Sequence, residues 1–212
     1  MTRAKAKPRS YHHGALREAL LAAALDILEE EGLEGLTLRG VAARANVSHA
    51  APAHHFPSIK ALRTALGEIA FFKFGDAMTA ARAAAEKTPE AQLRAAGVGY
   101  LTFARAHPGL FKLMFSDSLI DCDDPAYVES AGAAFAQLVE ISMPAAEALG
   151  YTSESERVEI IKLVWSVAHG YAHLVLEQQM RKLEPLADAS GEFTPPDLAA
   201  IMFAVAKKPA RA

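Results

Sequence analysis

Apolar side chains recur every three or four residues through most of the chain, and this spacing constrains the fold more than any other feature. In residues 14–31, Leu16, Leu20 and Ile27 fall on one face of a helix. A half-buried strand would instead alternate apolar and polar residues. Because Ala and Leu dominate and β-branched residues are sparse, the sequence predicts an all-α protein. Its 212 residues are enough for one large or two small domains with a buried core.

Capping residues, glycines and prolines define the ends of the expected helices. Gly32 is placed to end the first helix, and Thr37, Ser48 and Ser58 to cap the next three. Pro144 falls inside a later helix and predicts a kink or a break there. The expected helices cover residues 14–31, 38–45, 49–55, 59–86, 89–106, 110–115, 125–149, 154–183 and 195–207.

Charge is unevenly distributed, although the formal net charge is only −3. Residues 1–64 carry nine Lys and Arg against six Asp and Glu, whereas residues 65–212 carry thirteen against nineteen. Four of the basic residues lie in residues 1–10, which have almost nothing apolar and are expected to be a disordered basic arm. The asymmetry favours a polyanion partner at one end, and a merely solvated tail is the alternative.

Other features disfavour secretion and membrane insertion. The first apolar run carries Arg17, Glu18 and Asp26, so it predicts an amphipathic helix rather than a signal sequence. No run approaches the roughly 18 apolar residues of a membrane span. The single cysteine, Cys122, leaves no disulfide framework and no CxxC metal site. We therefore expect a cytoplasmic protein with no membrane partner.

The segment VSHAAPAHHFPSIKAL, residues 47–62, has too little apolar surface for a core helix. It follows two helices after a short turn, which is the spacing of a helix-turn-helix, where the later helix enters the major groove of DNA. Its small Ala side chains would let the backbone approach bases, which Ser and His could then hydrogen-bond. Helix starts after Thr37 and Ser58 offer backbone N–H groups to phosphates. The alternative is a small helical bundle whose third helix is merely exposed.

This region carries a family resemblance. The stretch GLTLRGVAARANVSHAAPAHHFPSIKAL, residues 35–62, closely resembles the DNA-binding domain of the TetR family of bacterial transcriptional regulators. YHHGALR, residues 11–17, resembles the opening of one subgroup, and WSVAHG, residues 165–170, resembles the C-terminal signature of the same subgroup. The N-terminal match spans residues 11–66. The residues expected to bind DNA are Thr37, Arg39, Ser48, His49, Ala50, Ala51, His54, His55 and Lys60.

Two positions depart from the family pattern. Ala53 stands where a phosphate-contacting Tyr is usual, and Ile59 stands where a Lys is usual, with Lys60 beside it. An Ala side chain cannot donate to a phosphate, so one backbone contact is expected to be missing, while Lys60 could replace the other. Losing a phosphate contact lowers affinity for all DNA sequences alike.

The resemblance implies a helix-turn-helix DNA-binding domain over residues 11–66, joined by the long helix from Ile59 to a ligand-binding and dimerisation domain over residues 67–212. It also implies a homodimer on a palindromic operator, an unidentified small-molecule effector, repression more than activation, and a nucleoid-associated location. The segment from residue 154 is apolar nearly all round, which suits burial against both its own core and a partner. The expected interface residues are Ala168, Ala172, Val175, Met202 and Val205.

Aromatic side chains gather between the expected long helices, where they form either core or the wall of a ligand pocket. His169 and His173 have the spacing of a metal pair, but a hydrogen-bonded pair is favoured, so no metal or cofactor is expected. The expected pocket residues are Phe72, Tyr100, Phe103, Phe111, Met114, Phe115, Trp165, His169 and His173.

Two competing functions remain to be considered. The chain lacks GxSxG, GxGxxG, P-loop and HExxH motifs, and we expect that it is not an enzyme. The second is an all-α small-molecule-binding or scaffold protein with weakened DNA binding, which the substitutions at Ala53 and Ile59 keep open.

Overall fold

The computed structural model describes residues 13–182 and 195–205, so the arm expected over residues 1–10 lies outside the described residues. Throughout those two ranges the protein is all-α, as predicted, with eight α-helices and two short 3₁₀ helices. In chain order these are α1 (His13–Gly35), α2 (Leu38–Arg44), η1 (Ala51–His54), α3 (Ile59–Ala83), α4 (Pro89–Ala106), α5 (Pro108–Met114), α6 (Pro125–Ala148), α7 (Glu154–Leu176), η2 (Gln179–Lys182) and α8 (Leu198–Val205).

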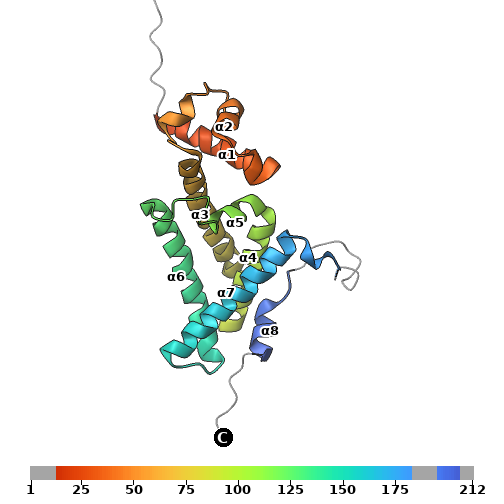
Figure 1. Cartoon of the computed structure of the whole chain (residues 1–212). Helices are drawn as coiled ribbons and strands as arrows, with labels where there is room; N and C mark the ends of the chain where they lie inside the picture. Colours follow the sequence, from red (N-terminus) through yellow and green to blue (C-terminus); the bar gives the residue numbers. More distant parts are fainter. Residues whose placement is uncertain (1–12, 183–194, 206–212) are drawn as a thin grey trace, which may run out of the picture.

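The helices form a small end and a larger body, which α3 joins. Figure 1 shows α1 and α2 at one end, with α3 running from them into the body. Leu62 and Leu66, near the start of α3, are fully buried in the same apolar cluster as Leu20 and Phe56. Farther along α3, Phe74 belongs to that cluster too. A continuous core therefore extends from the small end into the body.

Most helix ends follow the capping signals of the sequence. The hydroxyls of Thr37 and Ser58 accept hydrogen bonds from backbone N–H groups three residues later, at 3.0 and 3.1 Å. Gly32, where the first helix was expected to end, has a φ of 72° and a ψ of −168°, and these non-helical values kink α1, which continues to Gly35. Asn46 has a φ of 55° in the predicted turn after α2, which Asn tolerates better than most residues. α6 continues through Pro144 to Ala148, so the helix does not break there.

Several helices are shorter than predicted; α3, for example, ends at Ala83 rather than at residue 86. The expected helix over residues 49–55 is a 3₁₀ helix of four residues, and Ser48 does not cap it with its side chain. Hydrogen bonds from Ala51 N–H to Ser48 O and from His55 N–H to Pro52 O make successive three-residue turns instead. α7 was expected to reach residue 183 but ends at Leu176, before a left-handed residue at 178.

Helices α3 and α4 cross closely at Gly99. A Cβ atom at this position would lie 2.7 Å from the backbone oxygen of Ala77 and 2.8 Å from Cα of Met78. Backbone atoms cannot move aside as a flexible side chain could. Gly99 therefore sets the separation of the two helices.

We expect Gly99→Ala to lower the free energy of unfolding by about 1–3 kcal/mol, because the added methyl group would force the helices apart. Gly97, in the same helix, has nothing within 4 Å of such a Cβ and provides the matched control. Gly97→Ala should leave stability unchanged or raise it by up to about 1 kcal/mol through better helix propensity. Urea denaturation followed by circular dichroism measures both, and equal effects would contradict the assignment.

Candidate DNA-binding surface and ligand cavity

Apolar anchors on its inner side hold the helix-turn-helix region in place. Val41, Ala42 and Phe56 are buried, and Pro52 of η1 is among the most completely buried side chains. The guanidinium of Arg17 lies 5.5 Å from the centre of the Phe56 ring, within the range of a cation–π contact. Since these residues fix the inner side, the outer side is left for polar and small residues.

Most residues expected to bind DNA lie on this outer side. They come from α2, the following turn, η1 and the start of α3, at the end of the molecule that carries α1 and α2 (Figure 1). Ala51 and His55 are half-buried. The exposed members are Thr37, Arg39, Ser48, His49, Ala50, His54 and Lys60.

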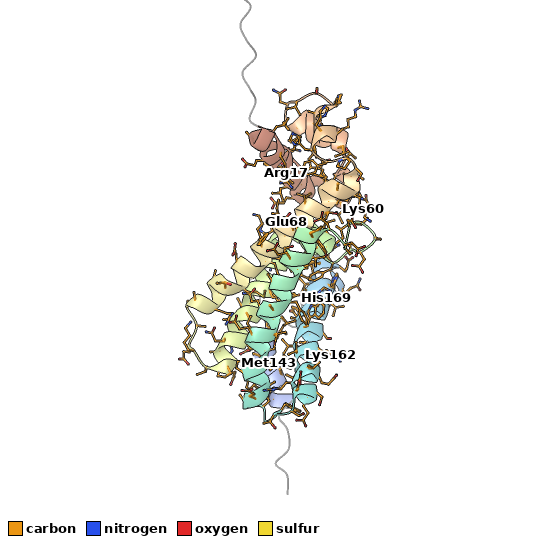
Figure 2. All side chains as sticks on the ribbon, turned by 90° about the vertical axis from the view of Figure 1, so that its left-hand side faces the viewer. Arg17, Lys60, Glu68, Met143, Lys162 and His169 are labelled. Atoms are coloured by element: carbon orange, nitrogen blue, oxygen red, sulfur yellow. The ribbon has the colours of Figure 1, made fainter. Side chains whose placement is uncertain are left out.

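The two unusual positions differ in their surroundings. Ala53 is exposed on η1, so its methyl group stands where a hydrogen-bond donor would face outward. Ile59 is half-buried and packs against the apolar cluster. Lys60 beside it is exposed, and Figure 2 shows Lys60 and Arg17 toward the end that carries α1 and α2. The positive charge therefore points outward from residue 60 rather than 59.

The body meets this end of the molecule through α5 and the loop that follows it. A Cβ on Gly109 would lie 2.8 Å from the backbone oxygen of Leu28, so α5 packs directly on α1. His107 Nδ1 lies 2.8 Å from Glu29 Oε1 at the same contact. The buried hydroxyl of Thr64 accepts a 2.8 Å hydrogen bond from the N–H of Asp121 and donates to the backbone oxygen of Lys60.

A cavity of about 250 Å³ lies in the body, lined by α3, α4, α6, α7 and the end of α5. This is close to the lower end of the usual size of small-molecule pockets. Of the expected pocket residues, Tyr100, Met114, Phe115 and Trp165 line it. The sequence prediction omitted the other lining residues, which are Phe71, Phe74, Met78, Asp117, Tyr127, Ala131, Ala134, Phe135 and Leu138.

Five expected pocket residues are not part of this lining. Phe72 is 54% exposed, and it is not among the residues that line this cavity. Phe103 and Phe111 are buried in the main apolar cluster. His169 and His173 lie beside the cavity rather than on its wall, where their rings pack against Phe111.

His169 connects to the cavity through Tyr100. The Tyr100 hydroxyl and His169 Nδ1 share a hydrogen bond of 2.8 Å, and the rings of His169 and His173 are 4.5 Å apart. Burial, and then the neighbouring His173, lower the pKa of His169. Burial raises the pKa of Tyr100. In the part of the chain that the structure describes, no three His, Cys, Asp or Glu residues come together as a metal site would require.

A smaller lobe of about 50 Å³ adjoins the cavity and shares Met78, Tyr100, Leu138 and Trp165 with it. The lobe is almost entirely apolar except for Ser142, whose buried hydroxyl has no hydrogen-bond partner. Such a group usually finds a partner, so Ser142 offers a hydrogen bond to whatever reaches this lobe.

Comparisons with known proteins agree with this architecture. Residues 20–66 match the family model of bacterial regulatory proteins of the tetR family, and residues 93–194 match that of the tetracyclin repressor-like C-terminal domain. The chain belongs to the TetR family. It is therefore a DNA-binding transcriptional regulator rather than an enzyme. No curated protein matches the chain.

Several solved structures resemble this TetR-family chain. A protein of unknown function from Rhodococcus sp. RHA1 is 35% identical, with a TM-score of 0.69, and the match covers 82% of this chain and 89% of that one. A TetR-like transcriptional regulator from the same organism is 21% identical, with a TM-score of 0.58 and coverages of 95% and 96%. A putative tetR family regulator from Shewanella sp. PV-4 is 20% identical, with a TM-score of 0.60 and coverages of 91% and 96%. The last two support the fold alone.

None of the described helices is both long enough and apolar enough to cross a membrane.

The lowered pKa of His169 predicts a loss of stability in acid. As the pH falls below about 6.5, His169 is protonated in the unfolded chain but remains neutral in the folded chain. The free energy of unfolding therefore falls as the pH falls. His169→Gln removes the titrating group. We expect a smaller difference in urea stability between about pH 7.5 and 5.5 in this variant than in the wild type. His49→Gln, an exposed control, should keep the wild-type difference, and an unaltered difference in His169→Gln would contradict the assignment.

Proposed function

We propose that this regulator is a ligand-responsive repressor that acts as a homodimer on a palindromic operator. The observation that carries the proposal is that α5 lies between an aromatic cavity and the DNA-binding end. Phe115, directly after α5, lines the cavity, while Gly109 near its start packs on Leu28 of α1. This seven-residue helix spans only about 10 Å, so a displacement at one end reaches the other.

The exposed residues of α2, η1 and the start of α3 contact the operator in this proposal. His49 and His54 can hydrogen-bond base edges, and the exposed Ala50 lets the backbone approach the groove or meets a thymine methyl group. Arg39 and Lys60 neutralise phosphates, together with the N–H groups at the starts of α2 and α3. Three further residues lie at the margin of this contact. Ala51 and His55 are half-buried and expose less surface, and Ser48 is exposed but precedes η1.

Ligand binding releases DNA by shifting a population between two arrangements. A ligand that binds one arrangement more tightly displaces Phe115 and with it α5, which bears on α1 through the tight contact at Gly109. The two DNA-binding ends of a dimer would then no longer match successive major grooves. The ligand can shift this equilibrium only by as much free energy as the difference between its affinities for the two arrangements.

We propose a dimer interface on a different face of α7 from the one expected. Ala168, Ala172 and Met202 are buried within their own chain and leave little surface for a partner, and Val175 is half-buried. The side chain of Val205 lies outside the described residues.

The exposed face of α7 is better suited to a partner. Leu163, Ser166, Gly170 and Leu174 are exposed and spaced by three or four residues, which aligns them on one side of the helix. Nothing lies within 4 Å of a Cβ at Gly170, so a partner helix can approach closely there. On α8, Ile201 is a second exposed apolar residue, 55% exposed. We propose these residues as the core of the homodimer interface.

Fluorescence anisotropy with the DNA upstream of the chain's own gene tests DNA binding, with scrambled DNA as the reference. We expect selective binding that weakens between roughly 50 and 200 mM salt, because binding displaces counterions from the phosphates. Lys60→Ala should weaken binding to all sequences and reduce the salt slope by about one. Lys73→Ala, an exposed lysine on the body part of α3, is the control and should change neither. Equal, unselective binding to both DNAs would favour the alternative of a binding protein that has lost operator recognition.

Leu174→Glu should release monomers, because it would place two charges in an apolar interface across the two-fold axis. Sedimentation velocity at micromolar concentration measures the change. Val128→Glu introduces the same charge at an exposed apolar position on α6 and should leave the dimer intact. A dimer that survives both Leu174→Glu and Leu163→Glu would overturn this interface.

A further inference from the structure

The lining of the larger cavity is aromatic and has one charge. Seven of the residues that line it are Phe, Tyr or Trp and two are Met. Asp117 is the single charged residue among the described lining residues, and no Lys, Arg or His is included. The cavity therefore has a negative group and no positive one.

Asp117 lies in the loop between α5 and α6, two residues beyond Phe115, and is exposed. None of the lysines and arginines in the described ranges forms an ion pair with it. Burial, followed by the charges of Cys122 and Asp117, raises the pKa of Tyr127 to about 12. The carboxylate of Asp117 therefore lies near the ring of Tyr127, and it lines the cavity while being exposed to solvent.

Rings and carboxylate attract the same kind of ligand. The face of an aromatic ring carries negative charge and attracts a cation, more strongly where water is excluded. The carboxylate of Asp117 accepts a hydrogen bond from the thiol of Cys122. Because no described lysine or arginine neutralises it, it adds a direct attraction to the same cation. An anion would be repelled by Asp117 and would find no positive side chain on the wall. His169, the nearest histidine to the lining, lies behind Tyr100 and its lowered pKa disfavours a positive charge.

We propose that the cavity binds an apolar cation, an aromatic or alkyl body that carries a tertiary or quaternary ammonium group. The ammonium lies at the opening beside Asp117, and the body lies among the rings of Phe71, Phe115 and Trp165. This identifies the chemical class of the effector, and it rests on the proposed ligand response of the same cavity. A ligand longer than one ring would extend into the smaller lobe, where the hydroxyl of Ser142 is available.

Three probes of similar size and different charge separate the possibilities. They are phenyltrimethylammonium, its uncharged isostere tert-butylbenzene, and the anion benzenesulfonate. Trp165 is the single tryptophan of the chain and lines both lobes, so its fluorescence reports binding directly. Titration of the full chain without DNA, at constant ionic strength, gives the affinity for each probe. We expect the cation to bind about tenfold more tightly than the uncharged isostere, and benzenesulfonate to bind most weakly.

Asp117→Asn keeps the size of the side chain and removes its charge. It should abolish most of the preference for the cation and leave the affinity for tert-butylbenzene unchanged. Asp123→Asn, an exposed acid in the same loop that does not line the cavity, should keep the preference. Equal affinity for cation and isostere, preference for the anion, an Asp117→Asn variant with wild-type preference, or no binding of any probe at millimolar concentration would each overturn the proposal.

The same preparations distinguish this inference from the proposed function. If the chain binds its promoter DNA selectively but does not prefer the cation, the repressor stands and the ligand class is wrong. If the cation binds and quenches Trp165 but never releases DNA, the ligand class stands and the proposed response is wrong.

Discussion

Helix α3 is the element on which the rest of the structure depends, because it belongs to both ends of the molecule. Its first turns pack Leu62 and Leu66 against α1 and Phe56, and its later turns supply Phe71 and Phe74 to the cavity. A protein whose two domains were joined by a linker could move either one without the other. Here one helix and one continuous core connect the two ends. A movement of side chains in the cavity must therefore shift the DNA-binding end or bend α3 itself.

Local signals in the sequence predicted local features well. A capping hydroxyl bonds a backbone N–H only three residues away, so its role depends on local sequence alone. The caps at Thr37 and Ser58 are therefore where they were expected. The all-α fold and the TetR family were also predicted correctly, since both rest on periodicity and on a motif of consecutive residues. The 3₁₀ form of η1 was not predicted. In four residues around the buried Pro52, the spacing of apolar side chains is too short to distinguish a 3₁₀ helix from an α-helix.

The faces of the helices and the wall of the cavity could not be read from the sequence in the same way. α7 is apolar nearly all round, so its pattern gives no reason to assign Ala168 to the core and Leu174 to the surface. Phe71 and Phe72 are adjacent and chemically identical, yet only the first lines the cavity. Asp117 lies in a loop, and its place at the opening depends on where α6 packs. Gly67 permits a close approach of α6 to α3, because a Cβ there would lie 3.1 Å from the ring of Tyr127.

The contacts that link the body to the DNA-binding end are close-packed rather than compliant. At Gly109 there is no room even for a methyl group against Leu28, and Thr64 fixes the loop before α6 to α3 through a buried hydroxyl. Packed interfaces of this kind do not deform gradually, and they shift between discrete arrangements. In the proposed ligand response, a displacement of Phe115 would therefore not be absorbed at the contact of α5 with α1. Either α1 moves with α5, or the ligand pays the full cost of separating them, and only the first outcome couples the cavity to DNA.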